Sequence, residues 1–140
     1  MLAKNLIIMV YLWSAISFCY YLTSFQLKYF PGEIYTNSYA SMLAEGLGIL
    51  ISGILTQLFE IRTALTLSFT ISFLGGFLIL MFGAKSIVWM PIFVGLARIG
   101  ISACFNLIYL VNSDVFPTLF AATAMGICNL LARIVTVLSP

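Results

Sequence analysis

Few side chains in this sequence could do chemistry, and two of the ionisable ones, Glu45 and Arg133, stand inside long apolar segments. On the membrane insertion scale an arginine at a helix centre costs about 2.5–3.5 kcal/mol, which the apolar neighbours of Arg133 offset, so insertion alone does not explain its presence. Its planar guanidinium suits a carboxylate. Three interpretations follow: Arg133 pairs with Glu45, it attracts an anionic substrate or ion, or it extends to the membrane interface.

Polar and small residues recur every three or four positions, which places them in rows on helices. The row around Glu45 predicts either a tight helix contact or a water-lined cavity, because small residues let backbones approach and a carboxylate in a span usually pairs or lines a pathway. The rows are Ser14, Ser17, Tyr21 and Ser24, with Tyr20 beside them; Ser38, Ser41, Glu45, Gly48, Ser52 and Thr56; Arg98, Phe105, Tyr109 and Asn112; and Gly126, Asn129, Arg133 and Thr136.

Several classes of function lack the residues they need. The chain has no histidine, which is the commonest general base and metal ligand. Its three cysteines lie far apart in apolar runs, which suggests neither a zinc site nor a disulfide framework. The six basic and four acidic residues are scattered rather than clustered. We therefore expect no enzyme, no metal, no cofactor and no nucleic-acid partner.

The elements that position these residues must be membrane helices. Of the 140 residues, 63% are hydrophobic and only 7% are charged, against roughly 25% charged in soluble domains. Five apolar segments cover residues 5–27, 35–58, 63–83, 87–115 and 117–140, each long enough to span a bilayer. We predict an all-α, polytopic transmembrane helix bundle, integral to the membrane, whose short connections make consecutive spans antiparallel neighbours.

The ends of the chain add two expectations. The first apolar segment has no small-residue cleavage site at the right depth, so we interpret it as a retained span rather than a signal peptide. The number of spans is odd, which places the two ends on opposite faces and is unusual for a complete transporter. We expect a further helix to be missing from this sequence.

Three stretches resemble the organic anion and organic cation transporters of the major facilitator superfamily. They are SFCYY at residues 17–21, LARIGISACFNLIYLVNSDVFPT at 96–118 and ATAMGICNLLARIVTVLSP at 122–140. The resemblance implies helices 7 to 11 of a twelve-helix carrier, so that residues 1–140 form a partial C-terminal transmembrane domain whose N-terminal half is missing. It further implies a plasma-membrane carrier that moves small organic ions by alternating access across the lipid bilayer.

Site residues follow from the same resemblance. Tyr20, Tyr21, Phe105 and Tyr109 match aromatic positions that line the central cavity, and Asn129 shares a row with Arg133. Arg133 matches the arginine typical of anion transporters, whereas Glu45 stands where cation transporters tend to have an acid. The expected chamber is therefore a shared, water-filled one that binds an organic solute through these seven residues.

The motifs of the inward gate are incomplete. Arg62 is the last arginine of a loop that usually reads D-R-x-G-R, and Asp114 matches the acid that ends the tenth helix, but Ala121 replaces the usual arginine of that motif. These departures leave a second interpretation open, in which the chain is a degenerate half-carrier or a non-transporting membrane subunit.

Overall fold

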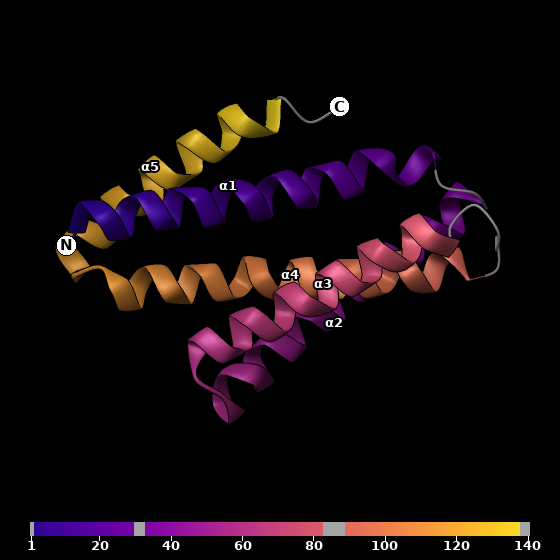
Figure 1. Cartoon of the computed structure of the whole chain (residues 1–140), viewed down its shortest axis with the longest axis horizontal. Helices are drawn as coiled ribbons and strands as arrows, with labels where there is room; N and C mark the ends of the chain where they lie inside the picture. The colour runs from indigo at the N-terminus through magenta and orange to yellow at the C-terminus, as the bar shows by residue number, and fades with distance from the viewer. Residues whose placement is uncertain (1, 30–32, 83–88, 138–140) are drawn as a thin grey trace.

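The computed structural model describes residues 2–29, 33–82 and 89–137. Those residues form five long α-helices and one short 3-10 turn, with no strand among them. The elements are α1 (Leu2–Gln26), η1 (Leu27–Tyr29), α2 (Ile34–Leu58), α3 (Ile61–Phe82), α4 (Met90–Val115) and α5 (Thr118–Val137) (Figure 1).

Each of the five helices is long and apolar enough to cross a membrane. The prediction of an all-α bundle with five spans is therefore confirmed, and the helix ends fall within three residues of the predicted boundaries wherever both are described. The predicted boundaries at 83, 87 and 140 lie outside the described residues.

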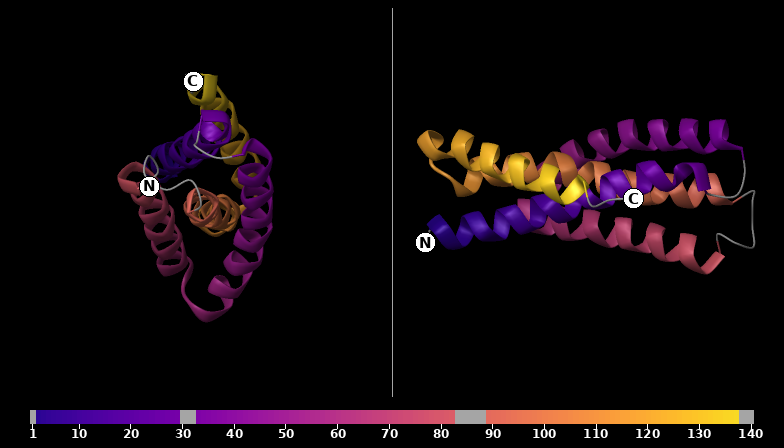
Figure 2. Two further views of the ribbon diagram at one scale, coloured as in Figure 1. Left: turned by 90° about the vertical axis from the view of Figure 1, so that its right-hand side faces the viewer. Right: turned by 90° about the horizontal axis from the view of Figure 1, so that it is seen from above.

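Helix α4 is the centre of the bundle. Over half of its spanning window, 56%, is buried, against 11–22% for the other four helices. α2 and α3 pack along one part of α4, while α1 and α5 lie on the other side (Figure 2). The outer helices therefore present most of their surface outward, and large apolar side chains such as Phe73, Leu80 and Leu119 are exposed there, as contact with lipid requires.

Glycine and other small residues bring α2 and α3 close to α4. A Cβ atom added to Gly48 of α2 would lie 2.7 Å from the backbone oxygen of Ile99. A Cβ on Gly75 of α3 would meet the backbone of Ala97, and one on Gly100 of α4 would meet the backbone of Ser72. No larger side chain fits at these three positions, so the helices approach by direct backbone contact.

The other side of α4 is packed by larger side chains. Met9, Trp13 and Ile16 of α1 share a buried cluster with residues of α4, of α5 and of the connection between them, namely Cys104, Ile108, Phe116, Ala124, Cys128 and Ala132. α5 reaches this cluster because the chain turns sharply after α4, at the predicted break around Pro117. The side-chain amide of Asn112 holds that turn by donating to the backbone oxygen of Ala121 at 3.1 Å.

The expected packing of consecutive spans is confirmed for α3 and α4, which make the most extensive helix contact of the bundle, but it is wrong for the first pair and weak for the last. No Cα atoms of α1 and α2 lie within 8 Å of each other, and α4 contacts α5 much less than it contacts α2 or α3. The physical reason is that α1 packs against α4 and α5 rather than against α2, while α5 packs against α1 more than against α4. Only side chains bridge α1 and α2.

Candidate functional site

Arg98 of α4 is the polar centre of the molecule. It is 7% exposed, and its guanidinium has donors directed at two other helices. Nε donates to Ser41 Oγ of α2 at 2.7 Å, Nη2 donates to Ser24 Oγ of α1 at 2.8 Å, and Nη1 donates to the backbone oxygen of Tyr20 at 3.3 Å. The guanidinium carbon also lies 4.4 Å from the centre of the Tyr20 ring. This arginine therefore links three helices.

Glu45 is the carboxylate of the same network. Its Oε1 accepts a hydrogen bond from the Tyr20 hydroxyl at 3.0 Å, and its Oε2 lies 4.0 Å from Arg98 Nη2. The side chain is 35% exposed, while that of Arg98 is 8% exposed. Ser102 of α4 donates to the backbone oxygen of Glu45 at 2.9 Å. Glu45 thus has one face toward a buried cation and another that is open.

Aromatic rings connect this network to α5. The rings of Tyr20 and Tyr21 meet edge to face at 5.6 Å, and Tyr20 lies 5.8 Å from Phe105. Phe105 in turn lies 5.8 Å from Tyr109, and Trp13 packs edge to face on Tyr109 at 4.8 Å. Four predicted site residues therefore form one aromatic cluster from α1 and α4, which the buried Trp13 supports.

Arg133 of α5 stands at the other end of this cluster. Its Nη1 donates to the hydroxyl of Tyr21 at 2.9 Å, and its guanidinium carbon lies 5.8 Å from the centre of that ring. It does not pair with Glu45: among the described residues, no carboxylate oxygen lies within 4.0 Å of Arg133. Asn129, one turn before it, donates to the backbone oxygen of Met125 at 3.1 Å. Arg133 is an exposed cation bonded to a neutral phenol.

The predicted site residues thus meet, but the part of the chain that the structure describes does not enclose a chamber around them. Tyr21, Phe105, Asn129 and Arg133 line a cavity of about 30 Å³ between α1, α4 and α5, which has room for a water molecule and not for an organic solute. The aromatic and charged groups instead lie along a partly open face. Within the described residues, these groups share one face and do not surround an enclosed space.

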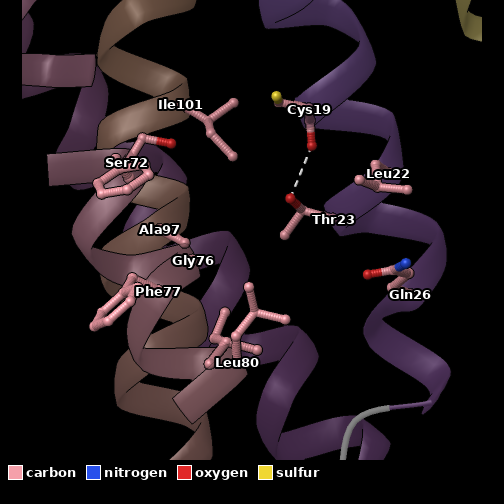
Figure 3. A pocket seen from close by; sticks show the side chains of 12 residues that line it. Cys19, Leu22, Thr23, Gln26, Ser72, Gly76, Phe77, Leu80, Ala97 and Ile101 are labelled. Carbon is pink, nitrogen blue, oxygen red and sulfur yellow. Dashed lines mark hydrogen bonds between the residues drawn. The ribbon is translucent and has the colours of Figure 1, made fainter. Parts of the chain in front are cut away.

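A cleft much larger than this cavity lies elsewhere. It has a volume of about 370 Å³ and is formed by α1 and α3 over a floor of α4 (Figure 3). Its walls are mostly apolar, and the hydroxyl of Thr23 is already bonded to the backbone oxygen of Cys19 at 2.8 Å. The cleft exists because no Cα atoms of α1 and α3 lie within 8 Å of each other. It offers no charged group to a ligand and is not the candidate site.

Arg62 is near the start of α3, and Asp114 is near the end of α4. These two predicted gating residues nevertheless line one surface depression. Glu60 and Thr56 line it as well. Both charged residues are exposed, and no nitrogen of Arg62 lies within 4.0 Å of a carboxylate oxygen of Asp114. The depression therefore collects the residues of the expected gate without an ion pair between them.

Sequence reasoning overlooked two members of the site. The sequence places Arg98 on a polar row, but only its position between Ser24, Ser41 and Glu45 reveals a role. Nothing in the sequence distinguishes Trp13 from an ordinary interfacial tryptophan. For the row around Glu45, the structure supports a tight contact: Ser41, Gly48 and Ser52 are buried.

Comparison with known proteins finds similarity to organic ion transporters. The chain is 24% identical over 137 residues to the organic cation/carnitine transporter 2 of Homo sapiens, with 96% of this chain and 24% of that protein aligned. It is 26% identical to solute carrier family 22 member 15 of Xenopus tropicalis, with 99% and 28% aligned, and 23% identical to solute carrier family 22 member 4 of Mus musculus, with 99% and 25% aligned.

The chain spans about a quarter of the length of these curated relatives. No family model and no solved structure matches it. The five spanning helices and this similarity together identify the chain as a multi-pass integral membrane protein that is similar to solute carriers of family 22.

Proposed function

We propose that this chain contributes the C-terminal wall of an alternating-access carrier for small organic anions, with its spans corresponding to helices 7 to 11 of a major facilitator fold. Its relatives are named as transporters and solute carriers over nearly the whole of this chain. A carrier has its binding site between two halves, which is consistent with a polar and aromatic face that is open on one side. Residence in the plasma membrane is part of the same proposal.

The charges on the open face support the proposal that the ligand is an anion. Glu45 lies beside Arg98 and accepts a hydrogen bond from Tyr20, so its negative charge is balanced within the protein. Arg133 has a phenol as its partner, and no carboxylate of the described residues lies within 4.0 Å of it. One positive charge on the face is thus left for a ligand, and a guanidinium binds carboxylates in a bidentate manner.

The aromatic cluster explains how the site would hold the rest of the ligand. Flat rings from Tyr20, Tyr21, Phe105 and Tyr109 offer apolar walls that accept many shapes. A flat aromatic carboxylate that stacks there would bring its charge to Arg133. Broad selectivity among organic anions follows from walls that supply contact area rather than directional bonds.

Uptake of 2-naphthoate, a flat aromatic anion, tests the proposal in cells that express the full-length protein. Arg133→Gln should lower uptake about tenfold because it removes a charge-assisted bond of about 1.5 kcal/mol. Arg133→Lys should lower uptake less, since it keeps the charge and loses the planar fork. Lys4→Gln, an exposed cation outside the site, serves as the control. Unchanged uptake in Arg133→Gln would exclude Arg133 from the site.

A non-transporting membrane subunit or degenerate half-carrier is the second candidate. The missing ion pair between Arg62 and Asp114 favours it, because the inward gate of a carrier is held by charge pairs. Stable copurification of the chain in a larger membrane complex, with no 2-naphthoate uptake above that of untransfected cells, would support this candidate and contradict the carrier.

A further inference from the structure

We propose that Arg98 is a positioning residue that sets the charge preference of the site by neutralising Glu45. The proposal rests on the proposed function, because it concerns the same open face. Arg98 itself does not reach a ligand, since its side chain is 8% exposed. It acts through the partly open carboxylate whose Oε2 lies 4.0 Å from its Nη2.

The geometry of Arg98 is that of a fixed charge. Ser41 of α2 and Ser24 of α1 accept hydrogen bonds from two of its nitrogens at 2.7 and 2.8 Å, and the ring of Tyr20 covers its face at 4.4 Å. A guanidinium held in three directions cannot turn away from the carboxylate. Tyr20 completes the arrangement because its hydroxyl binds the other oxygen of Glu45 at 3.0 Å.

Counting charges gives the consequence. With Arg98, Glu45 and Arg133 all ionised, the face carries one net positive charge. Without the charge of Arg98, Glu45 and Arg133 cancel, and an exposed carboxylate beside aromatic rings becomes a site for an organic cation. One buried residue, remote from the ligand, therefore decides whether the same aromatic wall prefers anions or cations.

Two probes of similar size isolate this effect. 2-Naphthoate and N-methylquinolinium are both flat two-ring molecules and differ mainly in the sign of their charge. Their binding to the purified full-length protein is measured by equilibrium dialysis, which requires no transport. The measured quantity is the ratio of the two dissociation constants, so a general loss of folded protein does not change it.

Three variants distinguish positioning from a merely structural role. In Arg98→Gln the preference for 2-naphthoate over N-methylquinolinium should fall about tenfold or more. In Glu45→Gln it should rise, since the face then carries two positive charges. The double variant Arg98→Gln/Glu45→Gln should return the ratio close to its original value, because the net charge is restored. Lys4→Gln and Glu33→Gln, both exposed and outside the network, are the matched controls.

The outcomes separate this proposal from the proposed function. If Arg98→Gln weakens both probes equally, or if the double variant does not restore the ratio, then Arg98 only supports the fold and the inference is wrong. The double variant also addresses folding, because it leaves no buried charge without a partner. Failure of the proposed function would show differently: the unmodified protein would bind 2-naphthoate without carrying it across the membrane, or Arg133→Gln would not affect its uptake.

Discussion

The two sides of α4 are packed by different means. Toward α2 and α3 the contact is made by glycine, alanine and serine, and backbones touch. Toward α1 it is made by Trp13, Met9 and Ile16, which are large, while α5 contributes the small residues Ala124, Cys128 and Ala132. Small residues let the helix backbones touch and leave few side-chain torsions that could change. Large residues keep the backbones apart, and aromatic rings and an arginine fill the space between them. The comparison shows that the candidate site lies where the helices are held apart.

That separation has a chemical use. Between α1 and α2, whose Cα atoms stay more than 8 Å apart, the contact is made by the side chains of Tyr20 and Glu45 together with Arg98. A polar network of this kind needs room and several partners, because each buried donor must be satisfied. The close backbone contacts of α4 with α2 and α3 fix the helix that carries the side chains of Arg98 and Phe105.

The largest effect on stability is expected when the close backbone contact between α3 and α4 is disrupted. Gly75→Leu should separate α3 from α4, because the new side chain meets the backbone of Ala97 and cannot escape by rotation. We expect a loss of about 3 kcal/mol in the free energy of unfolding, seen as a lower melting temperature of the purified protein in detergent. Gly76→Leu is the matched control, since nothing lies within 4 Å of a Cβ there. Equal melting temperatures for the two variants would contradict the close contact.

A smaller effect on stability is expected when a large side chain is removed from the contact between α1 and α4. Trp13→Ala removes a side chain that is 1% exposed and packs on Tyr109 and Phe105. Lipid is as apolar as the bundle interior, so the loss comes from the void and from lost contacts, at about 2 kcal/mol in stability. Because α1 also carries Tyr20 and Tyr21, 2-naphthoate affinity should fall as well. Tyr11→Ala, an exposed aromatic on the same helix, should change neither quantity.

The smallest effect is expected when a single hydrogen bond between α1 and α5 is removed. Tyr21→Phe keeps the ring that contacts Tyr20 and removes only the hydroxyl that binds Arg133 at 2.9 Å. Stability should change by about 1 kcal/mol or less, because Arg133 is exposed to water when it loses this partner. 2-Naphthoate binding should weaken a few-fold through the less ordered guanidinium. A loss as large as that of Arg133→Gln would mean that Tyr21 contacts the ligand directly.

The sequence by itself determined the class of the molecule and the rows of residues along each helix. Five apolar segments separated by short polar connections permit only helices in a bilayer, because every backbone group must be satisfied within its own segment. The spacing of Ser41, Glu45 and Gly48 likewise follows from the helical period, so their common face could be predicted.

Only the tertiary structure decided which rows meet. Arg98 and Glu45 are 53 positions apart and Arg133 is 88 positions from Glu45, and both arginines are equally plausible partners on the basis of charge. The choice follows from packing: glycine and serine contacts draw α2 onto α4 beside Arg98, while the large side chains of α1 lie between α4 and α5 and turn Arg133 to Tyr21. Residue types and local period do not encode that arrangement, because it depends on how whole helix surfaces fit together.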